Sequence, residues 1–453
     1  MNWVLAALAV LVLGGAACLF LEKRLAALRV LGPATALVAA ALGLFPVLLA
    51  LTAGVSARFD GSWSMPFGSL ALEMDALSAV FAGPILAICA LSALFGASYL
   101  RPHEGKKRLG VSWFCFNLLT ASMLVVVTAR NAVLFLLAWE IMSLASFFLV
   151  MFDHEQASVR RAGWTYLIAT HIGTAFLLVM FLLLGDGARS LDFDSFGAVA
   201  GAGAGIVFLL SLVGFGAKAG LMPMHVWLPE AHPAAPSHVS AGMSGVMIKT
   251  GIYGLIRVLT FLDAPPAWYG WTLLGIGVVS GVLGVLFALA QHDLKRLLAY
   301  HSVENIGIIT IGLGVGLLGV TFGNGLLAFL GFAGALLHVV NHALFKSLLF
   351  LSAGSVLHAT GTREMDHLGG LLKRMPVSGL AFLVGAAAIC GLPPLNGFVS
   401  EFMIYLGALS AVTDSTPALC VAGVAVIGAL ALIGGLAAAC FTKAFGVVFL
   451  GEG

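Results

Sequence analysis

Apolar runs long enough to cross a bilayer recur along almost the whole chain. A helix of about 20 apolar residues spans the hydrocarbon core of a membrane. Runs of this kind fall at 2–21, 33–55, 76–98, 111–129, 131–152, 163–185, 203–222, 238–262, 268–290, 300–320, 325–357, 377–410, 416–435 and 436–450. We therefore predict an all-α polytopic membrane protein with about 14 transmembrane helices, since the short polar segments between the runs leave no room for a soluble domain.

The composition supports the same class. Of 453 residues, 61% are hydrophobic and 9% are charged, and the mean hydropathy is +1.08; a soluble domain carries about 25% charged residues. A net charge of +2 without a basic stripe excludes a nucleic-acid partner. The six cysteines stand singly in apolar runs, without metal or cluster spacing. We interpret them as small core residues and not as disulfides or redox ligands.

Lysine and arginine are distributed unevenly between the two sets of alternate loops. One set carries fourteen of these residues and the opposite set carries four. Because positive loops stay in the cytoplasm, the N-terminus is predicted to lie outside. The first run, 2–21, has no basic segment ahead of it, so we expect a retained span and not a cleaved signal peptide.

Two of the predicted spans are interrupted by helix breakers. The seventh continues past 222 into a stretch with Pro223 and Pro229, and the twelfth contains Pro393, Pro394 and Gly397. Broken helices at membrane depth are tolerated where the freed backbone faces protein or a wet cavity, and a matched pair of them is typical of inverted-repeat transporters. We therefore predict two inverted five-helix repeats, each with one broken helix. The predicted division is 1–110 for N-terminal helices, 111–262 and 263–435 for the repeats, and 436–453 for a C-terminal helix.

Five charged side chains lie inside these apolar runs: Glu140, Lys218, Lys249, Lys346 and Glu401. Placing a charge in hydrocarbon costs at least about 2.5–3.5 kcal/mol, so intramembrane charges usually mark an ion path. Glu140 is either satisfied by neighbouring serine hydroxyls or paired with Lys218, whose proton affinity it would then set. Lys249 is too far from a helix end to reach the interface easily.

His338, His342 and Lys346 repeat every four residues. This spacing places them on one face of a helix over roughly 12 Å of rise. The two histidines could be metal ligands, but the next member of the row is a cation and no third ligand stands nearby. A proton wire fits better, because neutral imidazole accepts a proton on one nitrogen and donates from the other. Glu401 follows the second break and is predicted to be the terminal carboxylate.

Three further histidines surround the first break. His225, His232 and His238 are either proton-intake groups or loop residues without a role in transport. Lys443 lies too near the end of the chain to be assigned. The sequence contains no flavin or metal motif, so we expect no cofactor, no metal and no redox reaction catalysed by this chain alone.

Four long stretches resemble one family. They are 129–143 (ARNAVLFLLAWEIMS), 218–237 (KAGLMPMHVWLPEAHPAAPS), 293–307 (DLKRLLAYHSVENIG) and 342–350 (HALFKSLLF). These stretches look like the antiporter-like proton-pumping subunits of respiratory complex I, Mrp-type antiporters and membrane-bound hydrogenases. The segments HPAAPSH and WEIMS resemble in particular the large membrane subunit of hydrogenase-4 and formate hydrogenlyase.

The resemblance implies roles for the buried residues. Glu140 and Lys218 would be the ion pair of an intake half-channel, and Lys249 the central relay. His338, His342 and Lys346 would continue toward Glu401 in an exit half-channel. The implied partners are other membrane subunits and peripheral redox subunits, in the plasma (inner) membrane of a prokaryotic cell.

Three functions remain open from the sequence. The first is a proton-translocating subunit driven by the redox chemistry of its partners, and the second is a subunit of a cation (Na⁺)/proton antiporter. The third is a structural membrane anchor with residual charges. Larger family members continue with further spans and a lateral helix, so we expect this chain to be a short variant or a segment of a longer one.

Overall fold

The computed structural model describes residues 1–63, 68–197 and 199–451, without the side chains of 187 and 188. Within this part, 12 helices are long and apolar enough to cross a membrane, and two shorter apolar helices, Pro376–Ile389 and Asn396–Val412, accompany them. The described strands form one two-stranded sheet. The prediction of an all-α polytopic membrane protein is confirmed.

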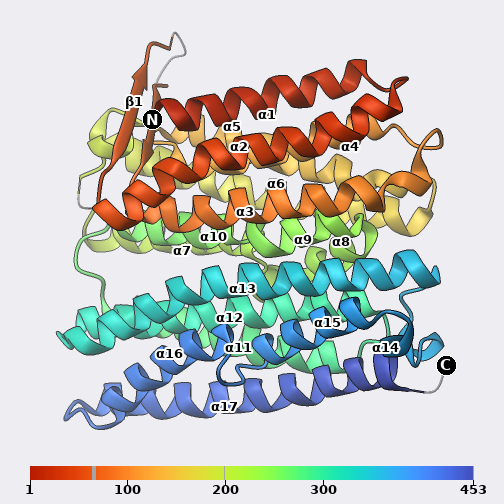
Figure 1. Ribbon diagram of the computed structural model, residues 1–453. Helices are drawn as coiled ribbons and strands as arrows, with labels where there is room; N and C mark the ends of the chain where they lie inside the picture. Colours follow the sequence, from red (N-terminus) through yellow and green to blue (C-terminus); the bar gives the residue numbers. More distant parts are fainter. Residues whose placement is uncertain (64–67, 198, 452–453) are drawn as a thin grey trace. The chain divides into compact units, whose positions relative to one another are not determined.

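Figure 1 shows the elements in chain order. They are α1 (Asn2–Phe20), α2 (Leu25–Ala53), β1 (Ala57–Gly61), β2 (Leu70–Met74), α3 (Ala76–Tyr99), η1 (Arg101–His103), α4 (Leu109–Thr128), α5 (Ala132–Val150), η2 (Met151–Asp153), α6 (Ala157–Ala188), η3 (Phe193–Ser195), α7 (Gly201–Ala219), η4 (Met224–Trp227), α8 (Leu228–Ala234), α9 (Ser237–Gly242), η5 (Met243–Met247), α10 (Lys249–Leu259), α11 (Ala267–Leu289), α12 (Leu294–Thr321), α13 (Gly325–Thr360), η6 (Met365–His367), α14 (Leu371–Arg374), α15 (Pro376–Ile389), α16 (Asn396–Val412), α17 (Pro417–Phe445) and η7 (Gly446–Leu450).

The chain forms two compact units. The first comprises 1–218 and 234–263, and the second comprises 219–233 and 264–453. In the first unit α2 packs on α1 and α3, and α4 packs on α1 and α5. In the second, α12 lies between α11 and α13, while α16 packs on α13 and α17. Neighbouring helices within each unit run side by side (Figure 1).

The end of the chain differs from the predicted spans. The expected spans 416–435 and 436–450, and with them the separate C-terminal helix of 436–453, form one continuous helical segment, Pro417–Leu450. The stretch has no proline after its first residue and no polar loop, and Gly434 and Gly435 alone do not interrupt it. A helix in lipid is held together because every backbone group must be bonded internally. Residues 452–453 of this prediction lie outside the described residues.

Both predicted helix breaks are present. α7 ends at Ala219, Gly220 has a φ of +84°, and the Met222–Pro223 peptide bond is cis. The amide of Met222, freed from the helix, donates to the Ser280 hydroxyl of α11 at 3.0 Å. The backbone group that the break releases is therefore bonded to protein, as membrane depth requires.

The second break separates α15 from α16. Gly391 has a φ of +64°, and the Pro393–Pro394 bond is cis. The Asn341 side chain of α13 donates to the Asn396 carbonyl at 2.7 Å and accepts from the Asn396 amide group at 3.2 Å. This paired amide contact holds the start of α16 against α13.

An ion cluster ties the start of α3 to two other elements of the first unit. Asp75 accepts from the Ser78 amide at 2.7 Å, and Arg130 and Arg257 each donate to it at 2.8 Å. Burial alone would raise the pKa of the Asp75 carboxyl, but the hydrogen bonds and charge of Arg257 outweigh burial and hold the pKa well below its usual range.

Glycines bring α11 and α12 into backbone contact in the second unit. A Cβ on Gly284 would stand 2.7 Å from the amide nitrogen of Glu304, and one on Gly307 would stand 2.5 Å from that of Gly281. Small residues at such positions let two helix backbones approach closely. The close approach of the two helices fixes the position of Glu304, on α12, against Gly284 of α11.

Candidate functional site

The first cluster of polar groups lies between α5 and α6. Glu140, in the middle of α5, accepts a hydrogen bond from Thr174 at 2.5 Å and stands 3.2 Å from Nε2 of His171. The serine alternative is wrong, because Ser143 and Ser146 donate to the backbone carbonyls of α5 instead. Neither His171 nor Thr174 was singled out from the sequence, although both fall in the predicted span 163–185.

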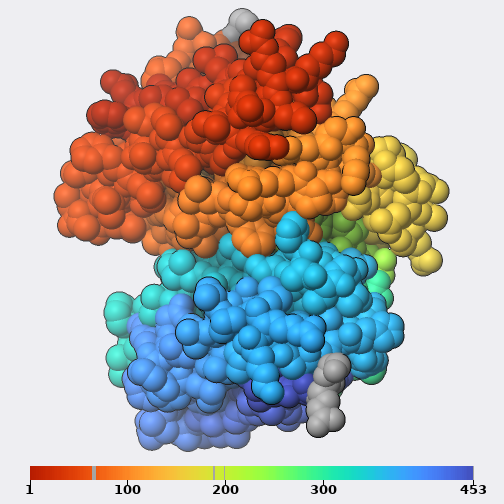
Figure 2. Space-filling view, turned by 45° about the vertical axis from the view of Figure 1, so that its right-hand side comes forward, coloured from red at the N-terminus to blue at the C-terminus, as the bar shows by residue number. Residues whose placement is uncertain are grey.

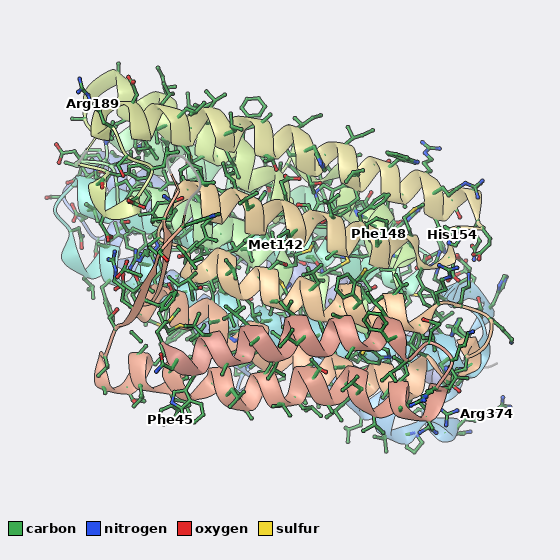
Figure 3. The ribbon with its side chains drawn as sticks, turned by 90° about the horizontal axis from the view of Figure 1, so that it is seen from above. Phe45, Met142, Phe148, His154, Arg189 and Arg374 are labelled. Atoms are coloured by element: carbon green, nitrogen blue, oxygen red, sulfur yellow. The ribbon has the colours of Figure 1, made fainter. Side chains whose placement is uncertain are left out.

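Figure 3 shows the setting of this cluster. α6 runs along one side of the first unit between the labelled residues His154 and Arg189, next to α5 with Met142 and Phe148. In Figure 2 the yellow residues of α6 lie on the outer side of this unit, beside the orange helices. Half of the His171 side chain is exposed in the isolated chain.

Lys218 lies near the end of α7, just before the first break. Its side chain is 1% exposed. The amine donates to the Ser143 hydroxyl at 2.8 Å and the Tyr166 hydroxyl at 3.2 Å, and it faces the Trp139 ring at 5.4 Å. Ser143 follows Glu140 by three residues, so Lys218 is bound about one helical turn from that carboxylate.

The expected direct ion pair between Glu140 and Lys218 is not formed. Among the described residues, Glu140 makes its ion contact with His171, and the hydrogen-bond partners of Lys218 are hydroxyls. The two charges still interact electrostatically. Glu140 and Ser143 are three residues apart on α5, so they occupy neighbouring positions on the surface of the helix. Ser143 meets Lys218 of α7, whereas Glu140 meets His171 and Thr174 of α6.

Lys249 is the first residue of α10, and only Ile248 separates it from the π-helical segment η5. It is 2% exposed, and its amine donates to the Ser244 carbonyl. π-Helical turns inside α-helices occur frequently at functional sites. Lys249 is therefore a buried cation bonded to irregular backbone, and the sequence pattern did not reveal the π-segment.

His338 is held in a defined network on α13. Its Nε2 lies 3.0 Å from Oδ1 of Asn305, and its Nδ1 lies 2.9 Å from the Ser400 hydroxyl. Because the Asn305 amide nitrogen donates to the His301 carbonyl at 2.8 Å, its oxygen accepts from Nε2 of His338. The His342 ring stacks parallel to that of His338 at 6.4 Å, as their spacing of four residues predicts.

Lys346 has a carboxylate nearby that the sequence analysis missed. The amine is fully buried and has no hydrogen bond within the described part of the chain, and the Phe350 ring lies 5.8 Å away. It interacts electrostatically with Glu304 of α12. Glu304, 1% exposed, is hydrogen-bonded to Nδ1 of His301.

The signal for this carboxylate was present in the sequence. Glu304 and His301 belong to the stretch 293–307 that carries the family resemblance, inside the predicted span 300–320. Glu304 stands only five residues into that predicted span, where a charge can be taken for a helix-end residue. α12 begins earlier, at Leu294, which places Glu304 well inside the helix.

Glu401 lies in the first half of α16, against the second break. It is 8% exposed, and a Cβ on Gly391 would stand 2.6 Å from its Oε2. Only glycine both adopts the positive φ of Gly391 and leaves this room for the carboxylate. The break and the acid are therefore packed against each other.

The three histidines predicted for the intake side lie among aromatic rings. The His225 ring is parallel to that of Phe287 at 6.5 Å, and His232 lies 5.7 Å from Phe350. His238 packs against Phe116 at 5.6 Å. Their role in proton intake stays a prediction.

Lys443 has a local structural role. Its amine donates to the carbonyls of Leu289 and Gln291 at 3.0 and 3.2 Å. These carbonyls lie at and just beyond the end of α11, where the last carbonyls of a helix lack partners within the helix. Lys443 therefore caps α11.

The chemistry available to these residues is proton transfer. No group of three or more histidine, cysteine or carboxylate side chains in the described ranges is placed to hold a metal ion. Each unit instead holds a buried lysine, a carboxylate within electrostatic range and a histidine beside that carboxylate. Such a set can hold and release protons without a redox centre.

Known proteins resemble this chain at the level of family and fold. The transmembrane family described as NADH:quinone oxidoreductase/Mrp antiporter matches residues 129–428. Hydrogenase-4 component B of Escherichia coli is 43% identical over 424 residues, which are 92% of this chain and 62% of that protein. Formate hydrogenlyase subunit 3 of the same organism is 35% identical over 393 residues, 86% of this chain and 63% of that protein.

A solved structure has the same fold. A chain of the Mrp complex from Dietzia sp. is 28% identical, with a TM-score of 0.83 over 99% of this chain and 47% of that one. The chain thus spans less than two thirds of the length of these relatives. The family match covers more than half of the chain and all of Glu140, Lys218, Lys249, Lys346 and Glu401. The protein belongs to the NADH:quinone oxidoreductase/Mrp antiporter transmembrane family.

Proposed function

We propose that this chain is a proton-translocating membrane subunit of a complex I-like or group 4 hydrogenase assembly. Partner subunits carry out the redox reaction, and this chain moves protons with the energy released. The proposed setting is the plasma membrane of a prokaryotic cell, with the N-terminus outside. The partners are further membrane subunits and peripheral redox subunits.

Lys218 is the observation that carries the proposal. It is fully buried in the span and lies about one turn from Glu140 beside a helix break, and among the described residues its hydrogen-bond partners are neutral hydroxyls. Burial disfavours the ammonium form, whereas the nearby carboxylate favours it. Because the two effects oppose each other, a small movement of Glu140 or of the break decides whether the lysine holds its proton.

The second unit repeats this arrangement and supports the proposal. Lys346 is buried without a hydrogen bond in the described chain and interacts with the Glu304 carboxylate. Because the Lys346 amine makes no hydrogen bond within the described residues, it loses none when its protonation state changes. A merely structural anchor would instead be expected to satisfy its buried amines.

The proposed order of groups follows the chain. Glu140 and Lys218 load the proton, and Lys249 is the central relay. His338, His342, Lys346 and Glu401 release it, with Glu304 added as the counter-charge of Lys346.

Two substitutions test this function in membrane vesicles that contain the assembled complex. Lys218→Ala and Glu140→Gln should leave assembly intact and abolish proton uptake, measured by quenching of a pH-sensitive dye during turnover. Ser211→Ala is the matched control, because Ser211 is also buried on α7 and its hydroxyl only donates to the Phe208 carbonyl. Unchanged proton uptake in both variants would contradict the proposal.

Similarity to Na⁺/H⁺ antiporter subunits, together with the fold match to part of an Mrp complex chain, favours one alternative function, a Na⁺/proton antiporter subunit. The same vesicles separate the two. Proton movement that requires redox substrate and is unaffected by Na⁺ supports the redox-driven subunit. Proton movement that follows an imposed Na⁺ gradient without redox substrate supports the antiporter.

A further inference from the structure

His171 stands at the surface of the first unit and is bonded in a way that fixes one of its protons. Nδ1 lies 2.9 Å from the carbonyl oxygen of Leu167, one turn earlier on α6. A carbonyl oxygen can only accept, so Nδ1 carries a proton. The remaining ring nitrogen, Nε2, faces Oε2 of Glu140 at 3.2 Å.

This geometry determines the number of protons on the pair. If Nε2 and the carboxylate were both unprotonated, two lone pairs would face each other at hydrogen-bond distance. The contact is attractive only when one proton lies between them, either as imidazolium and carboxylate or as neutral imidazole and carboxylic acid. His171 and Glu140 together therefore hold one proton more than a neutral histidine and a carboxylate.

The surroundings place this proton at an outer face. The side chains of His171 and Glu140 are 48% and 29% exposed, whereas Lys218 is buried. The exposed neighbours on α6 are apolar, among them Ile168 and Ile172. An ionisable pair in the middle of such a face is costly unless it has a function or is covered.

The other groups near the pair are identified by the packed helices. α6 contributes Thr174, which donates to Glu140, and Tyr166, which binds the Lys218 amine. α7 contributes Lys218 itself. Its amine interacts electrostatically with Glu140 from the inner side.

We propose that His171 is the group through which Glu140 acquires protons from outside the chain, a role that rests on the proposed function. The Nε2–H bond breaks as the Oε2–H bond forms, which leaves neutral imidazole and carboxylic acid. When that acid gives its proton to the neutral amine of Lys218, the carboxylate and the ammonium ion form. The bare Nε2 then faces the carboxylate again, and their repulsion drives uptake of the next proton by His171.

The test compares two variants that keep different parts of the local bonding. His171→Asn retains a donor for the Leu167 carbonyl, and His171→Gln retains an amide donor toward Glu140. Neither side chain exchanges protons. Ile172→Ala is the matched control, since Ile172 is the next residue on α6, is exposed and makes no polar contact.

Proton uptake is measured from about pH 6 to pH 8 in vesicles with the assembled complex. Loss of a general acid–base group typically lowers a rate by about 10²-fold or more. We expect a loss of this order at pH 8 and a smaller one at pH 6, because protons are about a hundredfold more abundant there and their uptake depends less on a relay group. A third variant, His171→Ala, leaves the imidazole space empty, and added imidazole should restore its proton uptake.

Either of two results overturns the inference. The first is that an assembled His171→Asn or His171→Gln variant shows the same dependence of proton uptake on pH as Ile172→Ala. The second is that imidazole does not restore proton uptake in His171→Ala. Lys218→Ala is measured in the same series. If Lys218→Ala abolishes uptake while the His171 variants do not change it, only this inference fails. If Lys218→Ala has no effect either, the proposed function fails as well.

Discussion

Replacing Gly391 by alanine is expected to displace the Glu401 carboxylate while leaving the second unit folded. The new Cβ would stand 2.6 Å from Oε2 of Glu401. Ordinary van der Waals contact begins near 3.4 Å, so the carboxylate must withdraw by about 0.8 Å. Because the displaced atom is the end of a flexible side chain, the movement itself costs little free energy.

The backbone adds a separate and known cost. Gly391 has a φ of +64°, and an L-residue in the left-handed region costs about 1–2 kcal/mol. Gly361, which ends α13, has a φ of +75° and nothing within 4 Å of its added Cβ. Gly361→Ala therefore carries the same backbone cost without touching a carboxylate, and it is the matched control.

The assay measures thermal stability in detergent and proton uptake in vesicles for both variants. The two should lose similar stability. A misplacement of about 1 Å can slow a transfer step about 10²-fold, so proton uptake should fall by about tenfold or more in Gly391→Ala and stay near wild type in Gly361→Ala. Equal proton uptake in the two variants would refute the reasoning that Glu401 acts from its position against the break.

Three further outcomes are expected from the structure. Glu304→Gln removes the charge that acts on Lys346, so proton uptake should be lost while assembly persists, and retained uptake would contradict the role given to this carboxylate. Ser280→Ala leaves the Met222 amide without its acceptor, which should lower the free energy of unfolding by about 1–3 kcal/mol, read from the melting temperature in detergent. The pKa of Asp75 is lower in the folded chain than in the unfolded chain. Its contribution to the free energy of unfolding is therefore complete above its ordinary pKa of about 3.9 and is lost as the pH falls below that value. The difference in melting temperature between wild type and Asp75→Asn should therefore shrink from pH 7 to pH 3, and a constant difference would argue against the ion cluster.

An ionisable residue lies beside each of the two helix breaks. Lys218 precedes the first break by a few residues, and Glu401 packs on Gly391 of the second. Within the second unit, the Ser280 hydroxyl bonds the released Met222 amide at the first break, and the Asn341 side chain bonds the Asn396 carbonyl at the start of α16 after the second break. The breaks therefore provide irregular backbone beside an ionisable residue without leaving buried groups unbonded.

Hydropathy and local chemistry determined the class of the protein from the sequence alone. Apolar length predicts membrane spans because lipid excludes unbonded backbone, and proline predicts the breaks because it lacks an amide hydrogen. The buried charges and the histidine row on 325–357 followed from the same pattern. The last helix was divided wrongly because a long apolar run does not show by itself where one span ends.

The partners of each charge were decided only by the tertiary structure. Glu140 contacts His171 and Thr174, Lys218 binds Ser143 and Tyr166, and Glu304 lies near Lys346. A periodic pattern identifies which residues share a helix face. It does not give the rotation and axial offset of the neighbouring helix, and these two quantities, set by side-chain packing and glycine contacts, decide which polar groups meet.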